Sequence, residues 1–181
     1  AGEGEVSVVE QIVGFKKIKF HTHENVGYGE LLLPPLQMHT TAFWLTVPEA
    51  AVRALPAPRP AVIDALRGLA NALHTVSCVG LMVDPHDLGT TIGDRHDPEG
   101  PPAKDGAEAP GFDPTIFLYD HVPGGVGLAP RLFEERERIV QRARRLVESC
   151  PCAEGCPGCI GPAAMLVSTR KQLAIELAGV L

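Results

Sequence analysis

Four of the five cysteines in this 181-residue chain fall within ten positions, in the stretch CPCAEGCPGC at residues 150–159. Their spacing is C-x-C-x3-C-x2-C, and they are Cys150, Cys152, Cys156 and Cys159. Structural zinc takes four soft ligands in a tetrahedron, and closely spaced cysteines on tight turns supply them. Because all four ligands would come from the protein, the pattern predicts a closed, structural zinc site between the last two helices.

Three other states of these thiols remain open from the residues alone. Two disulfides would need an oxidising compartment, and nothing at the start of the sequence resembles a secretory signal. An iron–sulfur cluster also takes four thiolates, although the common ferredoxin spacings differ from this one. The thiols could also stay unligated. The fifth cysteine, Cys78, lies in an apolar stretch, and we interpret it as a small core residue.

A second group of residues could hold a hydrolytic metal ion. Asp84 and Asp120 each end a short apolar run, and carboxylates at the ends of neighbouring strands can hold Mg²⁺ or Mn²⁺ for phosphodiester cleavage. Alternatively, Asp84 and Asp87 cap the turn in DPHD. A metal-dependent nuclease is kept as an alternative function, beside a pure protein-interaction module. The candidate ligands for the nuclease are His21, His23, Asp84, His86, Asp87 and Asp120.

The stretch PGGVG lies between an apolar run and a predicted helix. Gly124 and Gly125 could let backbone N–H groups face a phosphate at the start of that helix. A tight turn that needs positive φ explains the same glycines, and no lysine follows them as in a nucleotide-binding loop. The turn is the preferred interpretation.

Basic side chains gather in the stretch RLFEERERIVQRARR, residues 131–145, with six arginines against three glutamates. Such side chains can hold a DNA backbone. A solvated helix face with internal ion pairs, or an interface to another domain, would explain them equally well. The candidate DNA-binding residues are Arg131, Arg138, Arg142 and Arg145 on this helix and Lys16, Lys17 and Lys19 on an early strand.

The bulk composition limits the class of protein. A chain of this length forms about one domain. The net charge of −6 and an aromatic content of 5% argue against a globally basic nucleic-acid binder and against a surface that stacks many bases. No apolar run approaches the roughly 18 residues of a membrane span, so we expect a cytoplasmic location without membrane contact. The acidic, proline-rich segment 94–113 is predicted to be a surface loop.

Hydrophobic periodicity predicts the elements that position these residues. Phe43, Leu45 and Val47 recur at every second position, so they share one face of a predicted strand. The whole chain indicates an α+β fold, with N-terminal antiparallel strands and a mixed sheet with packed helices. We expect an antiparallel meander within residues 6–47, a helix within 56–76, strands at CVGLMVD and TIFLYD that are covered on both faces, a long helix to about Glu148 and a last helix over roughly 162–178.

Several stretches together resemble a known family. They are GFKKIKFHTHENVGYGELLLPPLQMHTTAFWL at 14–45, ALRGLANALH, DPHDLG, IFLYDHVPGGVGLAPRLFE and CPCAEGCPGC. Nearly the whole chain is similar to the C-terminal zinc-binding domain of MrfA/SftH-type superfamily II DEAD/DEAH-box DNA helicases. The resemblance implies that the four clustered cysteines are zinc ligands. It also implies a longer parent protein that uses ATP to move 3′ to 5′ along DNA and unwind duplexes in DNA repair in the bacterial cytosol or nucleoid.

The motifs of the helicase motor are missing from these 181 residues. There is no G-x-x-x-x-G-K-[ST] loop and no DExH box. We therefore expect residues 1–181 to form one zinc-binding accessory domain with no catalytic residues and no small-molecule substrate of its own. Its partners would be the helicase core of the same chain, which would hold ATP and Mg²⁺, and DNA bound by the parent protein. The 94–113 segment departs from the family pattern.

Overall fold

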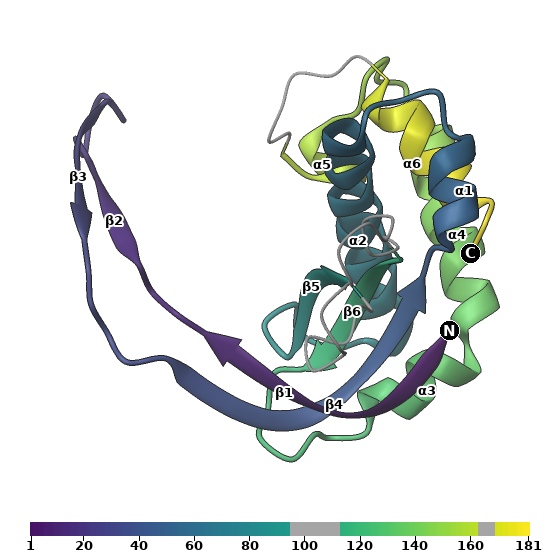
Figure 1. The fold of residues 1–181 in the computed structure, drawn as a ribbon, viewed down its shortest axis with the longest axis horizontal. Coiled ribbons are helices and arrows are strands. Elements are labelled where there is room, and N and C mark those ends of the chain that lie inside the picture. Colours follow the sequence, from purple (N-terminus) through teal and green to yellow (C-terminus); the bar gives the residue numbers. More distant parts are fainter. Residues whose placement is uncertain (95–112, 163–168) are drawn as a thin grey trace, which may run out of the picture.

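The computed structural model describes residues 1–94, 113–162 and 169–181, so the predicted surface loop at 94–113 lies almost wholly outside the described residues. The main body is an antiparallel sheet with helices packed against it (Figure 1). This confirms the α+β class. The sheet has the order β1-β4-β6-β5, with β1 at Gly2–Glu10, β4 at Leu36–Thr46, β6 at Pro114–Asp120 and β5 at Leu88–Asp94.

Every strand pair in the described residues is antiparallel, so the prediction of a mixed sheet was wrong in this respect. A mixed sheet would need two parallel strands joined by a helical crossover. The stretch CVGLMVD, which was predicted to be one of the strands, is not a strand. β5 and β6 instead pair directly, with Leu88 opposite Asp120 and Asp94 opposite Pro114. TIFLYD does form the predicted buried strand β6, in which Phe117 alone is only partly buried.

The stretch CVGLMVD mostly continues helix α2, which runs over Arg59–Leu81. Cys78 and Leu81 are buried, whereas Val79 and Met82 are 74% and 92% exposed, which is the three-residue spacing of a helix face. A short apolar run cannot by itself distinguish a buried strand from the end of a helix. The helix stops at Met82, which has the left-handed φ of 54°.

The predicted meander is divided between two sheets. β2 at Gly14–Ile18 and β3 at Asn25–Glu30 pair only with each other and form a separate two-stranded ribbon. We call residues 11–35 the arm, because Figure 1 shows this ribbon (purple) curving away from the helices. Lys16 and Lys17 lie on the predicted early strand, whereas Lys19 follows its end at Ile18. Ile18 and Phe20 are exposed. In contrast, Phe43, Leu45 and Val47 share a buried face as predicted.

The predicted long helix is broken in two. Glu135, with φ −93° and ψ 7°, separates α3 at Leu128–Glu134 from α4 at Arg136–Ser149. The described part of the last helix is α6 at Arg170–Ala178, and residues 163–168 lie outside the described residues. Two short helices complete the fold: α1 at Glu49–Ala54 and α5 at Pro157–Ile160.

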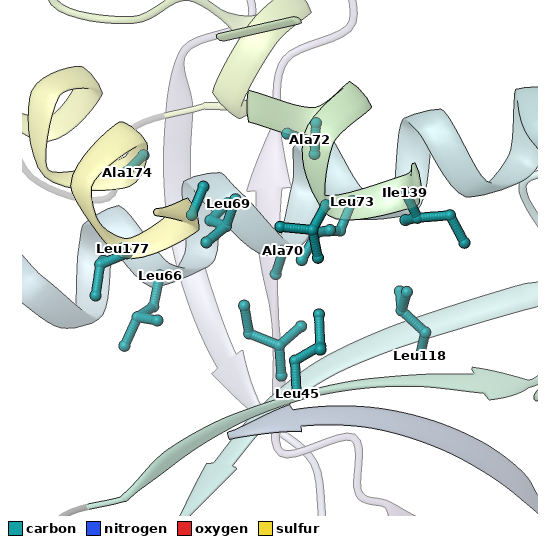
Figure 2. Packing of buried hydrophobic residues seen from close by; sticks show 14 of the residues in the cluster. Leu45, Leu66, Leu69, Ala70, Ala72, Leu73, Leu118, Ile139, Ala174 and Leu177 are labelled. Atoms are coloured by element: carbon teal, nitrogen blue, oxygen red, sulfur yellow. The ribbon is translucent and has the colours of Figure 1, made fainter. Parts of the chain in front are cut away.

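Helix α2 is the centre of the hydrophobic core. Figure 2 shows Leu45 and Leu118 pointing from the sheet toward α2 and the helices around it. Leu66, Leu69 and Leu73 of α2 are completely buried, and α2 contacts α4, α5 and α6 as well as β5 and β6. The core therefore fixes the ends of α4 and α6, between which the cysteines lie. No helix in the part of the chain that the structure describes is long and apolar enough to cross a bilayer.

Candidate metal centre

The four clustered cysteines are held by the ends of two helices. Cys150 directly follows α4, Cys156 caps the start of α5, and Cys159 lies within α5. Gly155 makes the tight approach possible, because it has a φ of 108° and a Cβ atom there would lie 2.1 Å from Cδ1 of Ile160. Pro157 occupies the first turn of α5, where its fixed φ suits a helix start.

The four sulfur atoms lie within 4.8 Å of one another. The Sγ–Sγ distances are 3.7 Å from Cys150 to Cys156, 3.5 Å from Cys152 to Cys159 and 3.7 Å from Cys156 to Cys159. A zinc ion with Zn–S bonds of about 2.3 Å at the centre of a tetrahedron separates its sulfurs by about 3.8 Å. These separations fit four thiolates around one ion, and they exceed the roughly 2.05 Å of a disulfide.

The metal-free thiols differ in acidity. Hydrogen bonds from the Cys150 thiol and from the backbone N–H groups of Cys159 and Gly158 lower the pKa of the Cys156 thiol to about 7. Burial, chiefly, raises the pKa of the Cys159 thiol to about 12. A metal ion bound here would have to displace a proton from Cys159, because only the thiolate is a metal ligand.

The residues of the nuclease hypothesis do not gather into one metal site in the described part of the chain. His21 and His23 lie in the turn at the tip of the arm, far from the sheet edge (Figure 1). Asp84 accepts hydrogen bonds from the backbone N–H and the ring of His86, which is the turn-capping role considered for DPHD. In residues 1–94, 113–162 and 169–181, the four cysteines are the only group of three or more potential ligands close enough to hold a metal ion.

Asp120 is fully buried at the end of β6, and its side chain caps the start of α3. Its Oδ2 atom accepts hydrogen bonds from the backbone N–H groups of Val126, Gly127 and Leu128, at 2.6, 3.0 and 3.2 Å. Gly124 and Gly125 have φ values of 82° and 75°, so the tight-turn interpretation of PGGVG holds. The N–H groups that a phosphate would use at this helix start are already bound by a carboxylate.

The candidate arginines lie on two helices rather than one. Arg131 is on α3, whereas Arg138, Arg142 and Arg145 are exposed on α4 at positions i, i+4 and i+7. Arg138 forms an ion pair with Glu135. Arg145 donates to the backbone carbonyl of Gln141 at 3.3 Å. Arg138, Arg142 and Arg145 therefore form one exposed basic face of α4, and Arg131 is separate from it.

The candidate lysines lie on the arm among exposed aromatic rings. The Nζ atom of Lys16 is 5.7 Å from the ring centroid of Tyr28. The Nζ atom of Lys17 is 5.8 Å from that of Phe15. Lys19 forms an ion pair with Glu24 at 2.8 Å.

Sequence reasoning missed two cations at the start of α6. Arg170 is 4% exposed and pairs with the buried Asp64 of α2, with 2.9 Å between Nε and Oδ2. Lys171 donates hydrogen bonds to the backbone carbonyls of Cys150 and Cys152. In a sequence, Arg-Lys at the start of a helix is typical of a solvent-exposed helix end. Only the structure shows that the arginine is buried, which is unusual for this residue type.

Comparison with known proteins gives one family match. The model of the MrfA Zn-binding domain matches residues 69–160, just over half of the chain, and this segment includes all four clustered cysteines. The crystal structure of the DUF1998 helicase MrfA bound to DNA superimposes with a TM-score of 0.69 at 32% identity, over 98% of this chain and 22% of that one. A second structure of MrfA, bound to DNA and AMPPNP, gives a TM-score of 0.58 at 33% identity over 97% of this chain and 20% of that one.

Two named relatives are ATP-dependent helicases. The uncharacterized ATP-dependent helicase YprA of Bacillus subtilis is 37% identical over 94% of this chain and 21% of its own length. The ATP-dependent helicase HRQ1 of Saccharomyces cerevisiae is 25% identical over 70% of this chain and 12% of its own length. The chain thus spans about a fifth or less of the length of these helicases. By its family match and by the cysteine cluster at the end of the matched segment, the chain belongs to the MrfA Zn-binding domain family.

Proposed function

We propose that this chain is the zinc-binding accessory domain of an ATP-dependent DNA helicase, and that the four clustered cysteines hold one structural zinc ion. The observation that carries the proposal is the set of sulfur separations of 3.5–3.7 Å, which suits one tetrahedral ion, in a segment matched by a zinc-binding family. The ligands would be Cys150, Cys152, Cys156 and Cys159.

The zinc ion would supply folding free energy to the junction between α4 and α6. The stretch from Cys150 to Cys159 has almost no apolar side chains apart from the cysteines, so hydrophobic burial can contribute little there. A structural zinc ion contributes about 10 kcal/mol or more of apparent binding free energy, which becomes folding free energy when the metal-free site is not formed. Protein sulfur atoms would fill all four coordination positions of the ion, so the site would be structural and not catalytic.

The metal content of the chain tests this proposal directly. Purified under reducing conditions, the chain should contain one zinc ion per molecule and no visible colour, because Zn²⁺ has a filled d shell. If the chain contained iron and absorbed visible light, the cysteines would hold an iron centre and not zinc. A chain that binds no metal even when zinc is supplied would contradict the proposed function.

The arm supports a bracing role within a longer protein. It exposes nine large apolar side chains within 25 residues, and concentrations of exposed apolar surface mark interaction sites. We propose that these side chains contact the helicase core of the same protein, which would hold ATP and Mg²⁺ and drive 3′ to 5′ movement along DNA during repair in the cytoplasm. The exposed apolar residues of the arm are Ile12, Val13, Phe15, Ile18, Phe20, Val26, Tyr28, Leu32 and Leu33.

The exposed arginines of α4 are proposed to contact the DNA backbone in the longer protein. Replacing Arg138, Arg142 and Arg145 together by glutamine should weaken DNA binding and make the slope of log K against log salt shallower by about two to three, since each lost phosphate contact removes roughly 0.7 to 0.9 from the slope. The dissociation constant should be measured over a series of salt concentrations. Because phosphate contacts do not depend on the bases, the loss of affinity should be the same for DNA of any sequence.

A matched triple variant of the arm separates the two basic surfaces. Lys16, Lys17 and Lys19 are changed together to glutamine, which removes the same formal charge from a different element. An unchanged affinity and slope in the arginine variant would refute the arginine contact. A loss confined to the lysine variant would assign DNA binding to the arm, whereas no loss in either would favour a pure protein-interaction module.

A further inference from the structure

Two neighbouring cations at the start of α6 hold the cysteine loop at its two ends. Arg170 donates hydrogen bonds to the backbone carbonyls of Ile160, Gly161 and Pro162, just after the last cysteine. Lys171 donates to the carbonyls of Cys150 at 2.7 Å and Cys152 at 2.8 Å, which belong to the first two cysteines. The backbone of the loop is therefore tied to α6 by side chains rather than by regular secondary structure.

Only one of these two cations retains an unneutralised charge. The guanidinium of Arg170 forms an ion pair with Asp64. No carboxylate of the described residues lies within ion-pair distance of Lys171, and the two groups that accept hydrogen bonds from its ammonium are neutral carbonyls. Lys171 is also half-buried, and its Cβ atom lies 3.9 Å from the Cβ position that a side chain at Gly155 would have. Its charge therefore lies against the cysteine loop.

A zinc ion bound by four thiolates carries a net charge of −2, since each ligand is deprotonated. A cation fixed beside such a group lowers its electrostatic free energy more strongly in a partly buried position than in bulk water. Groups that hold metal ligands from outside commonly set metal affinity, because they fix the orientation and the electron density of the ligand. Lys171 has both properties: it binds the backbone of two proposed ligands and it has the charge opposite to that of the centre.

We propose that Lys171 is a positioning residue for the metal centre, which orients Cys150 and Cys152 through their carbonyls and offsets the negative charge of the zinc–thiolate group. This inference rests on the proposed function, because it requires that zinc binds at the four cysteines. Lys171 touches neither the ion nor a sulfur atom in this role. It acts on zinc affinity through the backbone of the two residues that it holds and through its charge.

The test compares two substitutions at one position. Lys171→Met keeps most of the length of the apolar stem and removes the charge and all three donors, whereas Lys171→Arg keeps the charge and offers several donors. The dissociation constant for zinc should be measured by competition with a chelator of known affinity. We expect about 10- to 100-fold weaker binding in Lys171→Met and recovery of most of that loss in Lys171→Arg.

Cobalt gives a readout that a general loss of stability would not change. Co²⁺ bound by four thiolates in a tetrahedron has sulfur-to-metal absorption bands that depend on ligand geometry. We expect these bands to shift in Lys171→Met at full cobalt loading and to match the original chain in Lys171→Arg. The matched control is Arg53→Met, which removes an exposed cation of α1 and should alter neither zinc affinity nor the cobalt spectrum.

The two proposals fail in different ways. If the original chain binds zinc and Lys171→Met binds it equally well with an unchanged cobalt spectrum, the role of Lys171 is refuted and the zinc site stands. If Lys171→Met and Lys171→Arg lose affinity equally, a side chain that keeps the charge and the donors does not recover the loss, and the role proposed for that charge and those donors is likewise refuted. If the original chain binds no zinc, the proposed function itself has failed before the variants are compared.

Discussion

Replacing Cys159 by serine should abolish stoichiometric zinc binding and undock α5 and α6 from the core. Cys159 is 1% exposed, and its sulfur lies within 3.7 Å of the sulfurs of Cys152 and Cys156. A serine hydroxyl stays protonated at neutral pH and is a poor replacement for a thiolate in a four-sulfur zinc site. Since structural zinc supplies about 10 kcal/mol of apparent free energy and domains are stable by only about 5–15 kcal/mol, the loss should be large.

Two measurements follow this loss. Zinc per molecule should fall from one to well below one in Cys159→Ser, and amide hydrogen exchange in α5 and α6 should accelerate while exchange in the centre of α2 changes less. The matched control is Cys78→Ser, which changes a buried cysteine of α2 outside the cluster. This variant should keep one zinc ion and lose only about 1 kcal/mol of unfolding free energy. A Cys159→Ser chain that retained its zinc would show that Cys159 is not a ligand.

The cluster and the core faces could be predicted from the sequence because each depends on local spacing. Four cysteines within ten residues must lie near one another whatever the fold. The alternation of Phe43, Leu45 and Val47 likewise fixes which side chains share a face of β4. The buried run of β6 was also recognisable from its composition. In each case the information lies within about ten residues of the chain.

The errors come from features that local spacing does not determine. The apolar run CVGLMVD fits a helix or a strand equally well. It is mostly helical in the structure, where Cys78 and Leu81 pack against the core. No proline or glycine marks the break at Glu135, so the division of the long helix could not be foreseen. The sequence of the arm has the pattern of strands that belong to the main meander. In the structure, however, β2 and β3 pair only with each other.

Long-range ion pairs are the other kind of feature that sequence reasoning missed. In the sequence, Asp64 is an acidic residue near the start of a predicted helix, where such a residue is common and needs no partner to explain it. The structure buries it to 1% exposure against Arg170, which is more than a hundred positions away. Nothing short of the tertiary fold brings these two positions together.

Replacing Arg170 by methionine should destabilise the zinc-loaded chain by about 3–5 kcal/mol, because it leaves the buried carboxylate of Asp64 without its cation. The guanidinium also donates to the carbonyls of Ile160, Gly161 and Pro162 at 3.0, 3.0 and 3.1 Å. Methionine keeps much of the apolar stem, so the loss reports on charge and hydrogen bonds rather than on a cavity. Urea unfolding monitored by circular dichroism measures the free energy difference.

The double variant Asp64→Asn/Arg170→Met separates the two parts of this loss. With the aspartate made neutral, the penalty for a buried unpaired charge disappears, so the double variant should be more stable than Arg170→Met alone. It should still be less stable than the original chain, because the three carbonyls after Cys159 lose their donor in both variants. The matched control Arg67→Met removes an exposed arginine of the same helix as Asp64 and should change the unfolding free energy by less than about 0.5 kcal/mol. A double variant no more stable than Arg170→Met would mean that Asp64 is not held as a charged partner, and that Arg170 stabilises the fold only through the backbone turn that follows the cysteines.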